Sequence, residues 1–156
     1  MRLYLVRHGK ATSDAEDPRR PLSESGRKKV GKVARQLARA DVRPGEIRHS
    51  GKLRAQETAE ILAEHLQPAS GLQIQSGLSP DDDPASAAEL AATAETDTML
   101  VGHLPHLGRL ASLLLCGNGD KDLILFKTAT IVCLERGSSG DPWLLRWILS
   151  PEVAGD

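Results

Sequence analysis

Residues 2–9 of the chain are RLYLVRHG, a short apolar run that passes directly into an arginine, a histidine and a glycine. A brief apolar run that ends near a glycine is typical of a buried strand covered on both faces of a sheet. Strand interiors disfavour an unpaired charge, so Arg7 and His8 are expected where the chain leaves the sheet. We therefore predict a strand over residues 2–6 with two cationic side chains at its carboxyl end.

The segments that follow alternate between amphipathic helix patterns and short strand patterns. Ser23 and Ser50 can each cap a helix, because serine accepts hydrogen bonds from the first amides of a helix. The other predicted elements are strands near Ile47 and over residues 72–75, 98–101, 130–134 and 143–148, and helices over residues 84–94 and from Leu107 to Gly117. This alternation predicts a single domain over residues 1–156, a three-layer α/β/α sandwich with a mostly parallel central sheet and an antiparallel edge strand.

The composition is that of an ordinary globular protein. Its 156 residues are 40% hydrophobic and 26% charged, which excludes collagen-like and wholly disordered chains. A formal net charge of -1 predicts no nucleic-acid partner and no membrane partner. No apolar run has the length of a signal peptide core or a membrane span, so we expect a cytoplasmic location. Cys116 and Cys133 lie in apolar segments without metal-binding spacing, which predicts buried free thiols.

Charged residues follow the predicted parallel strands, and in such sheets ligands bind beyond the carboxyl ends of the strands. The residues there are Arg7 and His8, then 49–54, then Asp81, Asp82 and Asp83, then Gly102 and His103. Two like charges at about 4 Å repel by about 4 kcal/mol at an effective dielectric of about 20, so this edge needs an anion. Phosphate is expected, because arginine binds its oxygens bidentately and the helix that carries Arg54 adds its positive N-terminal end.

Three stretches resemble the signature motifs of the histidine phosphatase (phosphoglycerate mutase-like) superfamily. They are LVRHG at residues 5–9, LRAQETAEIL at 53–62 and VGHLP at 101–105. Within this superfamily, RHGKATSD, RRPLSESG, LSPDDD, GHLPHLG and LFKTATI resemble the phosphohistidine phosphatases, and the likeness extends over nearly the whole chain. The resemblance implies a phosphoglycerate mutase-like fold, and the loops are too short to add a lid domain.

The resemblance also implies that His8 attacks phosphorus and becomes transiently phosphorylated, while Arg7, Arg54 and His103 hold the phosphoryl oxygens. Imidazole must be neutral to attack, and neighbouring guanidinium groups favour the neutral form. Gly9 allows a sharp turn that leaves a backbone group to orient the other ring nitrogen of the histidine. The sequence leaves His103 open between a neutral donor and an imidazolium.

Other polar residues near these motifs receive secondary roles. Arg20 lies in a segment that is often near the site in relatives, so it is either a secondary substrate contact or a solvated loop residue. Asp14 is expected to brace the same loop, and His106 to start a helix or contact the rim of the site. His49 stands where relatives usually have serine, which we interpret as loop variation.

The sequence departs from many superfamily members, which carry a glutamate as general acid after the third strand, because this chain has only SPDDDP there. Asp81, Asp82 or Asp83 could take that role, but three acids before a proline are typical of a solvated turn. A phosphoramidate needs no such acid, since it can leave as neutral imidazole once its ring is protonated. The sequence therefore favours a metal-independent phosphohistidine phosphatase with no cofactor. Its expected partner is a phosphohistidine-bearing protein, such as a phosphotransfer domain or a phosphocarrier.

Two other functions stay open at this point. One is a small-molecule phosphomonoesterase of the same superfamily, with one of the three aspartates as the acid. The other is a non-catalytic module that binds a phosphorylated partner, although such a module has little use for a nucleophile among its cations. The sequence also leaves the oligomeric state open.

Overall fold

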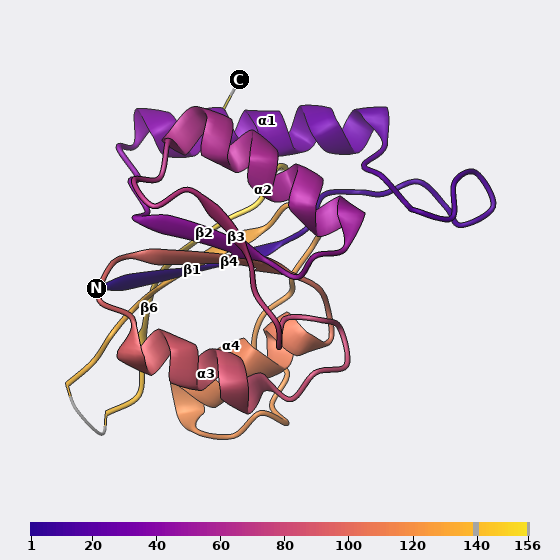
Figure 1. Ribbon diagram of the computed structural model, residues 1–156. Coiled ribbons are helices and arrows are strands. Elements are labelled where there is room, and N and C mark those ends of the chain that lie inside the picture. The colour runs from indigo at the N-terminus through magenta and orange to yellow at the C-terminus, as the bar shows by residue number, and fades with distance from the viewer. Residues whose placement is uncertain (139–140, 156) are drawn as a thin grey trace.

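Six strands form one sheet between two layers of helices in the computed structural model, which describes residues 1–138 and 141–155 (Figure 1). The elements in chain order are β1 (Arg2–Arg7), α1 (Glu24–Arg39), β2 (Glu46–His49), α2 (Leu53–Leu66), β3 (Leu72–Ile74), α3 (Pro84–Thr93), β4 (Thr98–Gly102), α4 (His106–Cys116), β5 (Ile131–Glu135) and β6 (Leu144–Leu149). Helices α1 and α2 cover one face of the sheet, and α3 and α4 cover the other. The predicted three-layer sandwich is confirmed.

The strand order is β3-β2-β4-β1-β5-β6, with β1, β2, β3 and β4 all parallel. The antiparallel part of the sheet lies at the β5–β6 edge, as predicted. The strand that opposes the others is β5, while the outermost strand β6 runs with the parallel set. The short connection between these two strands explains the reversal, because a parallel crossover needs a dozen or more residues.

The apolar run of β1 is buried on both faces, as its continuous pattern predicted. Leu3 and Leu5 pack with the core under α3 and α4, whereas Tyr4 and Val6 pack with the core under α1 and α2. Alternate residues of a strand point to opposite faces, so a strand at the centre of a sandwich needs apolar residues at every position. No helix within residues 1–138 and 141–155 has the length and apolar character needed to cross a bilayer.

Helix ends follow the predicted pattern at α1 but not at α2. Ser23 caps α1, and its side chain accepts a hydrogen bond from the amide of Gly26. Ser50 does not cap α2, because the capping position falls on Lys52 and the hydroxyl of Ser50 contacts His103 instead. At the last residue of α4, Cys116 is exposed and not buried as predicted, while Cys133 in β5 is buried.

The connection between β1 and α1 projects beyond the sheet, on the side where the chain leaves β1 (Figure 1). Its two ends are tied together by a bridge between Ala11 and Leu22 and by a bond of 2.8 Å from the amide of Ser23 to the carbonyl of Lys10. The amide of Leu22 also donates to the Glu57 carboxylate on α2 at 2.8 Å. The base of this loop is therefore fixed against two helices.

Gly26 is expected to be essential for this attachment. A Cβ atom at Gly26 would lie 2.1 Å from the carbonyl oxygen of Lys10, which is backbone and cannot turn aside. We expect Gly26→Ala to lower the free energy of unfolding by about 1–3 kcal/mol, measured by urea unfolding. Gly31→Ala on the same helix is the matched control, because its nearest neighbour is the flexible end of Arg35 at 3.2 Å. Helix propensity makes Gly31→Ala neutral or stabilising by up to about 1 kcal/mol, and equal effects of the two changes would contradict the packing argument.

Candidate active site

His8 and His103 lie side by side because β1 and β4 are neighbours. The two strands end in register, with Arg7 paired to Gly102, so the next residue of each strand enters the same space. The amide of His8 donates to the carbonyl of Gly102 at 3.0 Å. The ring centroids of His8 and His103 are 5.0 Å apart, with planes inclined by 49°.

Two hydrogen bonds of Thr58 hold the helix turn that carries Arg54 against the turn after His8, an arrangement that the sequence did not predict. Arg54 is the second residue of α2, and the hydroxyl of Thr58 donates to its carbonyl at 2.8 Å. The same hydroxyl accepts from the amide of Gly9 at 2.9 Å. Fully buried Thr58 thus joins the N-terminus of α2 to the turn after His8. The motif LRAQETAEIL contains this threonine, but nothing in the sequence alone assigned it a contact with the first strand.

His8 is held in one tautomer. Its Nδ1 lies 2.7 Å from the carbonyl oxygen of Gly9, and a carbonyl can only accept, so Nδ1 carries the proton and Nε2 keeps its lone pair. Burial, together with the charges of Arg54 and Arg7, lowers the pKa of His8 to about 4. The ring is therefore neutral at pH 7, with a nucleophilic nitrogen available.

His103 is also neutral at pH 7, which decides the question that the sequence left open. Burial, followed by the neighbouring His8 and Arg54, lowers the pKa of His103 to about 3. Its Nε2 is 2.6 Å from the hydroxyl oxygen of Ser50, and its side chain is 1% exposed. Ser50 orients this ring, a role that helix-capping rules could not predict.

The guanidinium groups of Arg7 and Arg54 form few hydrogen bonds within the described part of the chain. Arg7 donates from Nη1 to the carbonyl of Phe126 at 2.7 Å. The buried Nε atoms of Arg7 and Arg54 find no acceptor in the part of the chain that the structure describes. Burial lowers the pKa of both guanidinium groups. Buried donors are almost always hydrogen-bonded in folded proteins, so this pair of arginines is suited to binding an anion with several oxygens.

Arg20 contributes charge to the same site. It has a φ of 50°, its Nε donates to the carbonyl of Thr12 at 3.2 Å, and Asp14 lies 3.7 Å away. The charge of Arg20 lowers the pKa of His8 and of Arg54. The structure thus brings Arg20 near the other cations, and its contact with Asp14 agrees with the predicted bracing of this loop.

Comparisons with known proteins give this arrangement a family. A sequence model of the histidine phosphatase superfamily (branch 1) matches residues 3–79. The phosphohistidine phosphatase SixA of Escherichia coli (strain K12) is 30% identical over 156 residues, which cover 97% of this chain and 94% of SixA. The chain belongs to the histidine phosphatase superfamily.

Two further comparisons extend over most of the chain. An uncharacterized protein of Picosynechococcus sp. is 36% identical over 149 residues, which cover 89% of this chain and 87% of that protein. A structure of the protein histidine phosphatase SixA complexed with tungstate superposes with a TM-score of 0.85 at 28% identity, covering 97% of each chain. This histidine phosphatase therefore has the predicted phosphoglycerate mutase-like fold, with no lid domain over the described residues.

The acidic loop of this histidine phosphatase is engaged in local backbone contacts. Asp82 accepts from the amide of Ser79, and Asp83 caps α3 by accepting from the amide of Ala85, both at 2.9 Å. The charges of Asp82 and Asp83 act on His106, which is fully buried at the start of α4 and whose pKa burial lowers. Asp81 is exposed to solvent. The acidic run therefore forms a turn, as predicted, and His106 begins a helix, as predicted.

Acid is expected to destabilise this histidine phosphatase through its buried rings. The unfolded chain protonates histidine near pH 6.5, whereas the folded chain protonates His8 at about pH 4 and His103 at about pH 3. The stability that the two neutral rings contribute is therefore fully present above pH 6.5. It is lost as the pH falls from 6.5 toward the pKa values of the folded chain. Urea unfolding should show a loss of about 2 kcal/mol for each ring between pH 8 and pH 5. His49 and His106, whose pKa values are also lowered by burial, act in the same direction. Equal free energies at the two pH values would contradict this assignment.

Proposed function

We propose that this histidine phosphatase removes the phosphoryl group from a phosphohistidine on another protein, through a covalent phosphohistidine at His8. One observation carries the proposal: a neutral imidazole with a free Nε2 lies in the field of Arg7 and Arg54, whose buried Nε atoms have no acceptor in the described part of the chain. A simple anion-binding site needs the arginines but gains nothing from an oriented nucleophile among them.

In the first step, Nε2 of His8 forms a bond to phosphorus while the bond from phosphorus to the substrate nitrogen breaks. The electron pair of that bond leaves with the substrate imidazole, which departs neutral because its ring was already protonated. The Gly9 carbonyl holds Nδ1–H of His8, so the positive charge that develops on the attacking ring is stabilised by this hydrogen bond.

Arg7, Arg54 and His103 are proposed to hold the three equatorial oxygens, with Arg20 as an additional contact from the loop. The negative charge in the transition state is spread over these oxygens, and preorganised donors stabilise it. The arginines supply the positive charge in the proposed route and neutral His103 supplies a hydrogen bond, so we expect turnover to be insensitive to EDTA.

In the second step, water attacks phosphorus, the bond to Nε2 of His8 breaks, and orthophosphate leaves with the protons of the water. The ring returns to its neutral form, which the same arginines favour. Both steps break a bond between phosphorus and an imidazole nitrogen, so the leaving group is a neutral imidazole in each.

The contacts of the acidic loop favour a substrate whose leaving group needs no general acid. Asp82 and Asp83 are engaged by backbone amides near His106, which disfavours either of them as the acid that an alkoxide leaving group requires. The kinship with SixA, a phosphohistidine phosphatase, supports the same substrate class. Tungstate in the SixA structure is a tetrahedral oxyanion, as is the phosphoryl group proposed for this site. The identity of the partner protein and a cytoplasmic location stay predictions.

The test compares a phosphohistidine peptide with p-nitrophenyl phosphate and sugar phosphates, in the presence and absence of EDTA. We expect a kcat/KM at least about a hundredfold higher for the phosphohistidine peptide, because its leaving group needs no acid. Rapid quenching should trap a phosphoenzyme that is stable in base and labile in acid. A clear preference for the esters, or loss of turnover in EDTA, would overturn the proposal.

A further inference from the structure

Helix α1 is strongly basic in a protein that is nearly neutral. Its residues Glu24–Arg39 include six basic side chains and one acidic one, whereas the whole chain has a formal net charge of -1. The six basic residues are Arg27, Lys28, Lys29, Lys32, Arg35 and Arg39. The apolar residues of the helix face the sheet, so this charge lies on the outer surface.

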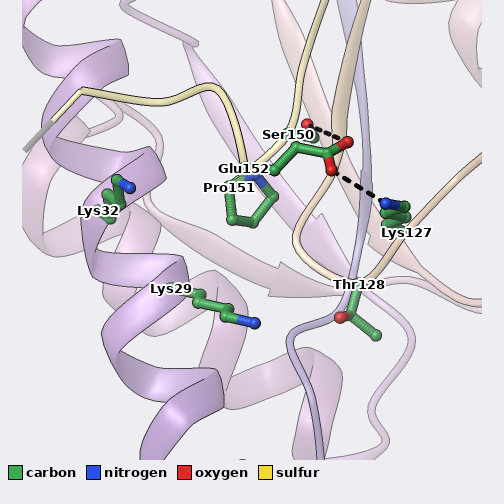
Figure 2. A pocket seen from close by; sticks show the side chains of 7 residues that line it. All are labelled: Lys29, Lys32, Lys127, Thr128, Ser150, Pro151 and Glu152. Carbon is green, nitrogen blue, oxygen red and sulfur yellow. Dashed lines mark hydrogen bonds and ion pairs between the residues drawn. The ribbon is translucent and has the colours of Figure 1, made fainter.

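Two of these lysines face away from α2 and line a pocket. Arg27 pairs with Glu57 of α2 and so marks the opposite side of the helix. Lys29 and Lys32 line a pocket of about 360 Å³ together with residues 127–128 and 150–152 (Figure 2). Lys29 is exposed and forms no ion pair with any residue in 1–138 or 141–155.

This pocket, here called the lysine pocket (Lys29, Lys32, Lys127, Thr128, Ser150, Pro151 and Glu152), adjoins the active site through the backbone. Phe126, which precedes Lys127, accepts the hydrogen bond from Arg7. Ala129, which follows Thr128, donates from its amide to the carbonyls of Arg7 and His8 at 3.1 and 3.2 Å. The two residues between them therefore lie at the edge of the catalytic centre.

The lysine pocket already binds a carboxylate of its own chain. Glu152 pairs with Nζ of Lys127 at 3.0 Å and accepts from the hydroxyl of Ser150 at 3.3 Å (Figure 2). The bond from Lys127 lowers the pKa of Glu152. The pocket thus binds a carboxylate through Lys127 and Ser150, and exposed Lys29 adds a further positive charge for an acidic side chain from outside.

We infer that the lysine pocket docks an acidic segment of the phosphohistidine-bearing partner, next to the phosphorylated residue. The inference rests on the proposed function and adds the feature by which a protein substrate is selected. Charge complementarity of this kind raises the association rate and excludes partners with basic surfaces. A small phosphorylated compound would not reach the pocket and would be indifferent to it.

The test uses three synthetic phosphohistidine peptides that differ only in their flanks. Eight glutamates, eight glutamines or eight lysines follow the phosphohistidine, a length that reaches about 26 Å when extended. We expect kcat/KM for the acidic peptide to exceed that for the basic one by at least about tenfold at low salt, and the difference to shrink at about 0.5 M NaCl. Phosphoramidate serves as the small substrate.

Charge variants test whether the preference for the acidic peptide arises at the lysine pocket. Lys29→Glu should reduce the advantage of the acidic peptide about fivefold, Glu152→Gln should increase it by freeing Lys127, and both should leave phosphoramidate turnover unchanged. Arg39→Glu, at the far end of α1, is the control with the same change in net charge. Equal turnover of the three peptides, or equal effects of Lys29→Glu and Arg39→Glu, would overturn the inference. Failure to hydrolyse any phosphohistidine peptide would instead overturn the proposed function.

Discussion

His8→Asn is expected to abolish turnover, with kcat for a phosphohistidine peptide reduced by at least about 10⁴-fold. The reason is geometric as well as chemical. Nε2 is the only ring nitrogen of His8 with a free lone pair, because Nδ1–H is bonded to the Gly9 carbonyl at 2.7 Å. Asparagine has a similar polarity but no nucleophilic nitrogen, so the covalent route is closed. Single-turnover kinetics with acid and base quenches would measure both the rate and the phosphoenzyme.

Binding separates loss of the nucleophile from loss of the fold. The arginines remain in His8→Asn, so tungstate should bind with a dissociation constant within about tenfold of the unsubstituted protein, because each lost neutral hydrogen bond contributes about 1 kcal/mol. Isothermal titration calorimetry with tungstate would measure this. Unchanged turnover in His8→Asn would contradict the covalent mechanism and would favour another nucleophile. Retained biological effect without turnover would favour the non-catalytic binding module.

Arg54→Met is expected to change activity and stability in opposite directions. The kcat should fall by about 10²–10³-fold, as it does when one preorganised donor to the transition state is removed. The free energy of unfolding should rise by about 1 kcal/mol in phosphate-free buffer, because a half-buried charge that Arg20 repels is replaced by an apolar side chain of similar length. Active sites often contain charged side chains without a partner, and these lower the stability of the fold.

The stability of Arg54→Met should be compared in urea with and without tungstate. The anion should stabilise the unsubstituted protein much more than the variant, since ligand binding to the folded state adds to its stability. Arg19→Met is the matched control, because Arg19 is in the same loop as Arg20 but pairs with Asp17 at 2.9 Å. It should change neither quantity by more than the small value of an exposed ion pair. A less stable Arg54→Met would show that Arg54 is mainly structural.

The local chemistry of the sequence determined the elements and the position of the candidate site. The apolar run of β1, the serine cap of α1 and the glycine at the end of α4 each act through neighbours within one turn or one strand. Parallel strands end at one edge, so Arg7, His8 and His103 could be assigned to the same edge from the order of strands and helices alone. The family motifs then assigned their chemistry.

Contacts between distant segments decided the rest, and the physical reason is their sequence separation. The bond from Ser50 to His103 and the clasp of Thr58 on Gly9 join residues on different elements, so no local pattern marks them. The neutral state of His103 depends on burial by the whole site. Likewise, the lysine pocket exists only because the segment after β6 packs beside α1. Short-range patterns specify which residues can act, whereas burial and charge in the folded chain determine the protonation states and partners with which they do so.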